Sequence, residues 1–301
     1  MDGPGYFSSH VVAILSIDEN GSLQTLPDKQ DAAAFYAFKC SFGLSGIVVE
    51  CVIEVRQANL CRADVDLKAY DSPEALTDGL LCLRKGYDAL LAVVILHQLV
   101  CFVEQRYRAG AGNVKPMRSQ PECEAYRIAK RLAIQRGFDG GSLPQPKGIV
   151  FSRYDFINEY WRSGETESRL DFQYYEHDIG RLEQVIVESY RFTRAFQQKT
   201  GFAPTSWATY FVHRHEKKSK PYGIYSGGPG ISCSFDPVYC NPNDLLWQQF
   251  SKEYNRLAID TLGGNPSPIQ TQWLRPGDAR IPKKLARSRF TTLYYQQFLV
   301  C

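Results

Sequence analysis

A chain of 301 residues, of which 44% are hydrophobic and 22% charged, is long enough to bury the core of a globular protein. Its formal net charge of +3 is spread along the chain, which excludes a nucleic-acid-binding footprint and makes a polyanionic partner unexpected. Nine cysteines without a CxxC pair predict reduced, mostly buried thiols rather than a metal or disulfide framework.

The N-terminal part of the chain predicts a small α+β layer. An apolar run, the turn sequence Glu19-Asn20-Gly21 and a second β-rich run are typical of a hairpin, and a short helix and another strand follow. We expect these elements over residues 11–17, 22–26, 31–39 and 46–56. The stretch GLSGIVVECVIEV, residues 43–55, combines two glycines with a β-branched run, which predicts a central strand beside a bound group.

Beyond this layer, long helices alternate with strands. The longest apolar run, residues 89–103, is too short to span a bilayer and is expected to form a buried strand or a strand pair. Helices are expected after Ser72, over residues 121–136, after Asp178, and from Asn241 to a stop at Gly263 and Gly264. Alternating strands are expected over residues 170–176, 206–215 and 231–235. This order predicts an antiparallel sheet with helices on one face and the other face free for a ligand.

Three segments together resemble one known superfamily. They are SFGLSGIVVECVIEV near the N-terminus, GGNPSPIQTQWL at residues 263–274, and RFTTLYYQQF at residues 289–298. The chain thereby resembles FAD-linked oxidoreductases of the vanillyl-alcohol oxidase and p-cresol methylhydroxylase type, most strongly over residues 3–56 and 231–299. The resemblance implies a remnant of the second FAD-binding subdomain over residues 1–58, a substrate domain over 59–274, and a segment, 275–301, that packs back on the first part.

The resemblance also implies roles for particular residues. Backbone contacts with a flavin are implied for Gly43, Gly46, Ile47 and Val48. Places near the isoalloxazine edge are implied for Gly263, Gly264, Pro266 and Gln270. The sequence departs from the family pattern where Val49 and Val52 replace threonines, and where Gln270 replaces a lysine of the sugar-lactone oxidase branch.

A larger departure concerns the family's first FAD-binding subdomain, which would precede Gly3, where only two residues stand. That subdomain carries the glycine-rich loop that holds the diphosphate. Losing about four charge-assisted hydrogen bonds would forfeit on the order of 6 kcal/mol of binding free energy. We therefore expect a truncated member that does not hold FAD in the usual way, unless another chain supplies the loop.

Aromatic side chains are dense in the strands of the expected substrate domain, which predicts an apolar, hydroxyl-fringed pocket on the open face of the sheet. The polar points of this pocket, and hence the candidate catalytic residues, are Gln173, Tyr175, Tyr210, His213, Gln270, Gln272 and Trp273. His213 and His215 lack a third ligand nearby in the sequence, so no metal site is expected. No nucleophile elbow, zinc-protease motif or nucleotide-binding fingerprint is present.

Three functions are compatible with this pattern. The first is a cofactor-independent cyclase or isomerase, such as a pericyclic [4+2] cyclase of secondary metabolism, which folds an apolar substrate into a near-attack conformer. The alternative is an FAD-linked oxidoreductase, either a fragment or completed by a partner chain. The second alternative is a small-molecule binding protein. In each case we expect an apolar small-molecule ligand, no membrane span, a cytoplasmic location, and a homodimer that covers exposed strands.

Overall fold

The structure is a computed structural model. It describes residues 11–26, 35, 38, 41, 43–54, 60–84, 89–108, 149–152, 171–213, 231–239 and 241–279. The helix expected over 121–136 and the segment 280–301 lie outside this part of the chain. Of the helix expected over 31–39, only Phe35 and Phe38 are described, and both are helical.

The N-terminal strands form a three-stranded antiparallel sheet in the order β2-β1-β3. The strands are β1 (Val11–Ile17), β2 (Leu23–Leu26) and β3 (Ile47–Ile53). The turn between β1 and β2 forms because the Asp18 carboxylate accepts hydrogen bonds from the amides of Asn20 and Ser22, at 2.8 and 2.9 Å. Gly21, with φ 81°, completes it. The predicted hairpin is therefore confirmed.

The third strand differs from its prediction as a central strand. Within the described residues β3 pairs only with β1, so it stands at the edge of its sheet. Four of its apolar side chains are about half exposed, namely Ile47 (54%), Val48 (51%), Val49 (54%) and Val52 (50%). The β-branched run fixed the strand but could not determine which strands would lie beside it.

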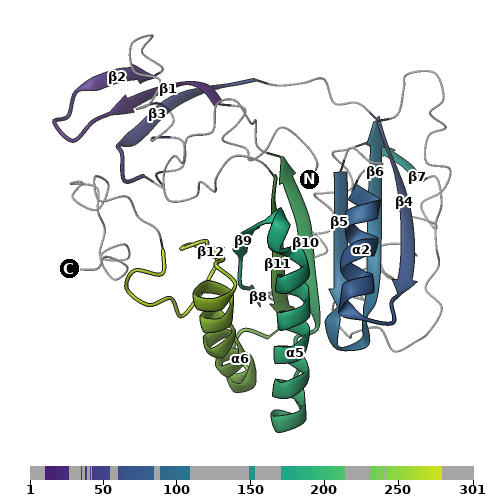
Figure 1. Cartoon of the computed structure of the whole chain (residues 1–301). Coiled ribbons are helices and arrows are strands. Elements are labelled where there is room, and N and C mark those ends of the chain that lie inside the picture. Colours follow the sequence, from purple (N-terminus) through teal and green to yellow (C-terminus); the bar gives the residue numbers. More distant parts are fainter. Residues whose placement is uncertain are drawn as a thin grey trace.

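In the part of the chain that the structure describes, the larger sheet has nine strands, and all of its strand pairs are antiparallel (Figure 1). Eight strands follow the order β12-β9-β11-β10-β5-β6-β4-β7, and β8 pairs with β11. Their bounds are β4 (Leu60–Ala69), β5 (Ala89–Ile95), β6 (Val100–Arg108), β7 (Ile149–Ser152), β8 (Asp171–Phe172), β9 (Tyr175–Asp178), β10 (Ser206–His213), β11 (Ile231–Tyr239) and β12 (Asn265–Pro266). The predicted antiparallel sheet is confirmed.

Two parts of this sheet differ in detail from the sequence prediction. Strand β4 was not expected, although it pairs along most of its length with β6. The strand expected over 170–176 is broken at Gln173 and Tyr174, because the Tyr175 amide donates to the Asp236 carboxyl, at 2.9 Å, rather than to a backbone carbonyl. The apolar run 89–103 forms the strand pair β5 and β6, joined by a short 3₁₀ turn, η2 (Leu96–Gln98).

Three long helices cover one face of the nine-stranded sheet (Figure 1). They are α2 (Pro73–Arg84), α5 (Leu182–Thr200) and α6 (Leu245–Arg256), with the short helices η3 (Ile179–Arg181) and η4 (Leu257–Thr261) at their ends. Helix α6 begins later than predicted because the Asp244 side chain caps it by accepting from the Leu246 amide, at 2.8 Å. None of the described helices could cross a membrane.

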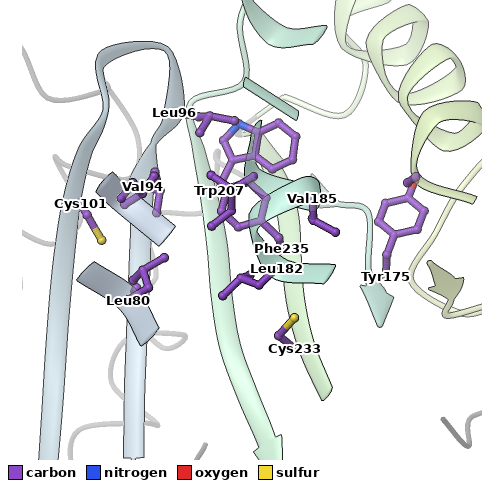
Figure 2. Packing of buried hydrophobic residues seen from close by; sticks show 14 of the residues in the cluster. Leu80, Val94, Leu96, Cys101, Tyr175, Leu182, Val185, Trp207, Cys233 and Phe235 are labelled. Atoms are coloured by element: carbon purple, nitrogen blue, oxygen red, sulfur yellow. The ribbon is translucent and has the colours of Figure 1, made fainter. Parts of the chain in front are cut away.

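The main core lies between these helices and the sheet. Figure 2 shows Trp207 and Phe235 from neighbouring strands packed against Leu182 and Val185 of α5. The rings of Trp207 and Phe235 stack with centroids 4.9 Å apart. Because side chains alternate along a strand, the residues on either side of Trp207 and Phe235 belong to the opposite face, which no described helix covers. We call this second side of the sheet the open face.

Candidate ligand-binding site

The open face carries a group of buried polar side chains. Ser232, Ser234 and Asp236 alternate along β11 with Cys233 and Phe235, which pack against the helices. All three polar residues are at most 5% exposed. A buried polar group costs free energy unless it is hydrogen-bonded, so three of them in a row on one strand require a reason.

The polar group extends across two neighbouring strands. Glu176 of β9 lies opposite Ser234 of β11, and Asn265 of β12 lies opposite Glu176. Directly opposed residues of antiparallel strands point to the same face, with Cβ atoms about 4.5–5.5 Å apart. Glu176 and Asn265 are 4% and 6% exposed. Asn265, Glu176 and Ser234 thus form a row across the strands, and we call this row, together with Ser232 and Asp236, the polar strip.

Two members of the polar strip have unused hydrogen-bonding capacity. The Ser232 hydroxyl and the Asn265 side-chain oxygen are buried and make no hydrogen bond within the part of the chain that the structure describes. Leaving such a group unpaired costs about 1–3 kcal/mol, so each one requires a reason, such as a bound water, ion or ligand. The unpaired atoms on this face make it a candidate place for a polar ligand group.

Asp236 is chemically unusual within the strip. Complete burial raises the pKa of its carboxyl well above 3.8, while the hydrogen bonds from the Tyr175 amide and the Ser234 side chain lower it in part. Burial therefore favours the neutral acid, which carries an O–H donor beside the oxygen that accepts from Tyr175. A neutral carboxyl can donate a hydrogen bond to a ligand oxygen.

The open face becomes apolar towards β10 and β5. Ala208 of β10 lies opposite Asp236, and Val93 of β5 lies opposite Ala208. Val93 and Ile95 alternate on the same side of β5 and are 6% and 3% exposed. A strip of aliphatic side chains therefore adjoins the polar strip, and a ligand with one polar end and an apolar body matches this division.

The predicted pocket residues separate into three groups. Gln173, Tyr175 and Gln272 come together at the corner of β9, α6 and the segment that follows β12. The Gln173 side-chain oxygen accepts from the Gln272 amide at 2.8 Å, and the Tyr175 hydroxyl contacts the Asn255 side chain, which in turn donates to the Gln272 carbonyl at 2.6 Å. Tyr175 belongs to the core on the helix side, so its ring lies away from the open face.

The second group lies at the surface. Gln270 is exposed, and Trp273 is 45% exposed with the Lys252 ammonium 4.0 Å from its ring centroid. Trp273 has φ 61°, a left-handed conformation that is rare for a bulky residue. The third group, Tyr210 and His213, belongs to β10, where only their backbone is described. Catalytic roles for all seven residues stay predictions.

Packing within the protein accounts for the two adjacent glycines. A Cβ atom at Gly263, which has φ 66°, would lie 2.6 Å from an Arg181 side-chain nitrogen. One at Gly264 would lie 2.6 Å from the His177 ring and 2.9 Å from the Ala258 carbonyl oxygen. The left-handed backbone at Gly263 and the close approach of neighbouring chain at Gly264 therefore favour glycine at both positions, independently of any role near a flavin.

The residues that the resemblance implies for FAD binding suit only one part of the cofactor, its ring system. Gly46, with φ 151°, is required because a Cβ atom there would lie 2.7 Å from the Ile17 carbonyl oxygen, whereas Gly43 faces open space. Ile47 and Val48 offer exposed apolar surface that suits a ring system. Acidic rather than basic side chains accompany them, with Glu50 in β3 and Glu54 directly after it. Residues 43–54 therefore offer no basic side chain to a diphosphate.

The polar strip was missed in the sequence, although a signal for it was present. In ISCSFDPVY, residues 231–239, serine and aspartate alternate with cysteine and phenylalanine. Alternation shows that the two faces of a strand differ but does not indicate which of them the helices cover. The sequence-based choice of Tyr175 on β9 fell on the helix side, and Glu176 beside it lies on the open face.

Comparison with known proteins gives a fold but no family. No protein-family model matches the sequence, and no curated protein matches it. Among solved structures, a solvent-stable cholesterol oxidase matches with a TM-score of 0.57 and 12% identity, over 88% of this chain and 59% of that one. The 6-hydroxy-D-nicotine oxidase of Arthrobacter nicotinovorans matches with a TM-score of 0.52 and 12% identity, over 97% of this chain and 62% of that one.

The protein therefore has a mixed α+β fold shared with these two oxidases. The chain spans about three fifths of the length of either. This likeness supports the fold implied by the sequence resemblance to FAD-linked oxidoreductases. The truncation and the boundaries at residues 58 and 274 stay predictions.

Proposed function

We propose that this chain forms the substrate-binding part of an FAD-linked oxidoreductase that acts on a small, largely apolar molecule. The observation that carries the proposal is the fold shared with two oxidases over 88% and 97% of the chain. The polar strip adds support, because it provides buried, unpaired hydrogen-bonding groups on the face that no described helix covers.

In this proposal the open face binds and orients the substrate. The polar end of the substrate lies against Glu176, Ser232 and Asn265, and its body lies along Ala208 and Val93. Burial excludes water from this surface, which strengthens each hydrogen bond that holds the polar end. Residues 43–54 offer no basic side chain to the flavin diphosphate, so in this proposal other residues of this chain or of a partner chain hold it, and no step is assigned to the flavin here.

The experiment that tests this function begins with the purified protein. We expect visible flavin absorbance, or saturable quenching of FAD fluorescence when FAD is added, and flavin-dependent oxygen uptake with an apolar alcohol or amine. Protein that is colourless, takes up no FAD and consumes no oxygen would contradict the proposal. Because a partner chain is one source of the diphosphate site, a colourless preparation is also assayed after affinity co-purification from the native host.

A cofactor-independent cyclase or isomerase is the second candidate, and one observation favours it. The neutral carboxyl of Asp236 lies on the same face as the aliphatic Ala208 and Val93, so it can donate a hydrogen bond to a substrate carbonyl that is held in a folded conformation. Product formation without flavin and without oxygen uptake would establish this candidate. Binding without any turnover would instead indicate the small-molecule binding protein.

A further inference from the structure

The strand β3 of the small sheet is exposed on both of its faces. Every residue from Ile47 to Val52 is exposed, and Ile53 is partly exposed. Within the described residues β3 pairs only with β1, so its other edge has no strand partner there. An apolar edge strand of this kind is a ready surface on which another strand can pair. This edge therefore has the features of an interaction surface.

A bulge limits the part of β3 that can pair regularly. The register between β1 and β3 shifts between Leu15 and Ser16, which leaves Val49 as an extra residue of β3. From Val49 to Ile53 the side chains alternate between the two faces, and the strand ends at Ile53. Cys51 is the middle residue of this regular run, residues 49–53.

A two-fold axis at Cys51 pairs the whole run with the same run of a second copy. In this antiparallel register Cys51 lies opposite Cys51 of the second copy. Val49 then lies opposite Ile53 of the second copy, so that two apolar side chains meet. Glu50 lies opposite Val52 of the second copy, so no two carboxylates face each other directly.

The neighbouring registers are less favourable because of two glutamates. A pair centred on Glu50 would place two carboxylates directly opposite each other. A pair centred on Val52 would place Glu50 opposite Glu54 of the second copy. Like charges directly opposite each other destabilise a strand pair. Registers centred on either end of the run leave most of it unpaired, so the run is most complementary to itself about its middle residue.

We propose that this chain self-associates through β3, as a two-fold antiparallel strand pair centred on Cys51 that joins two three-stranded sheets into one. The proposal goes beyond the proposed function and does not depend on it, because association is measured without flavin or substrate. The short strand pair covers less than the about 800 Å² per partner of a standard interface, so we expect a weak dimer with a dissociation constant on the order of 10 μM.

Sedimentation of the full chain under reducing conditions tests the association. Val52 is half exposed, so Val52→Lys and Val52→Glu both place a charge on the surface. Opposite Glu50 of the second copy the lysine forms an opposite-charge pair and the glutamate a like-charge pair, twice in each dimer. We therefore expect the Val52→Lys dimer to be about tenfold tighter than the Val52→Glu dimer. Leu23→Lys and Leu23→Glu change the net charge equally on β2, the other edge strand, and should not differ.

Cross-linking by oxidation tests the centre of the pair. Diamide takes one hydrogen from each of two thiols and leaves a disulfide. Directly opposite residues of antiparallel strands have Cα atoms about 4.5–5.5 Å apart, which a disulfide can span. We expect a covalent dimer that Cys51→Ser removes. Cys82→Ser, which changes another exposed thiol, should leave it in place.

A mixture of two variants determines the register. In a Cys51→Ser background, Glu50→Cys in one chain lies opposite Val52→Cys in the other. We expect diamide to join these two chains to each other, identified by the mass of the linked peptides, and not to join either chain to itself through the new thiol. Diagonal positions have Cβ atoms about 7–8 Å apart, farther than a disulfide reaches.

The proposal would be overturned by a wild type that stays monomeric up to about 200 μM. Equal association of Val52→Lys and Val52→Glu would overturn it too, as would a covalent dimer that Cys51→Ser leaves in place. A cross-link at Cys51 without a sedimenting dimer would show random collision and would also count against it. None of these results bears on the proposed function, which is tested by FAD uptake and oxygen consumption.

Discussion

Acid should destabilise this protein through one buried imidazole. His177 of β9 is 1% exposed, and burial lowers the pKa of its ring from 6.5 to about 4, with a smaller lowering by the nearby Arg181 guanidinium and an opposing effect of the Leu262 backbone. Gly264 packs directly against this ring. The fold therefore holds the imidazole neutral in a place with no room for rearrangement.

The sign and size of the effect follow from linkage. The unfolded chain binds the proton more tightly than the folded protein, because its imidazole keeps the ordinary pKa. The stabilisation by the neutral ring is therefore complete above pH 6.5 and is lost as the pH falls towards 4. At about 1.4 kcal/mol for each unit, the loss reaches about 3 kcal/mol, a large part of the stability of an ordinary domain.

A comparison of the wild type with His177→Phe and His177→Gln isolates this effect. Asp236 acts in the opposite direction, because its raised pKa means that its contribution to stability is lost as the pH rises from its unfolded value. The pH slope of the wild type alone therefore mixes the two groups. Urea unfolding between pH 7.5 and 4.5 should show the wild type losing about 2.5 kcal/mol relative to either variant.

The test depends on the difference in unfolding free energy between the wild type and each variant. A difference that stays the same from pH 7.5 to 4.5 would falsify the reasoning, whatever the absolute cost of the substitution at neutral pH. A constant difference would mean that the imidazole takes up its proton as readily in the folded protein as in the unfolded chain, because water reaches the ring.

Three further predictions concern stability and association. Gly264→Ala should lower the free energy of unfolding by about 1–3 kcal/mol, because the added Cβ atom overpacks the site. At Gly201 a Cβ atom would meet nothing within 4 Å, so Gly201→Ala should cost only the left-handed backbone strain of about 1 kcal/mol. Equal costs of the two variants in urea unfolding would be against this reasoning. Asp244→Ala should cost about 1 kcal/mol by removing the cap of α6, and Asp244→Ser should recover most of it in the same assay. Val49→Lys on the exposed edge strand should reduce self-association in gel filtration, whereas Leu245→Lys at the start of α6 should not change it. A wild type that elutes as a monomer would contradict the expected homodimer.

Local chemistry made several elements of this protein predictable from the sequence. The hairpin follows from Glu19-Asn20-Gly21, and the helix predicted after Asp178 follows from the Asp178 cap of η3 and from the apolar stripe along α5. The antiparallel sheet with helices on one face follows from alternating strands between amphipathic helices. These features depend on residues close together in the chain, so turn chemistry, capping and periodicity are sufficient to specify them.

Tertiary structure alone decided which residues form the candidate site. The pairing of Asn265 with Glu176, and of Glu176 with Ser234, joins residues up to 89 positions apart in sequence. The helices α5 and α6 pack against the face of the sheet that carries Tyr175 and Phe235. Glu176 and Asp236, the next residues along the two strands, therefore lie on the opposite face. Side chains that alternate in polarity along a strand show that its two faces differ. Which face is covered depends on where distant helices pack, and that choice placed a polar strip on the side that no described helix covers.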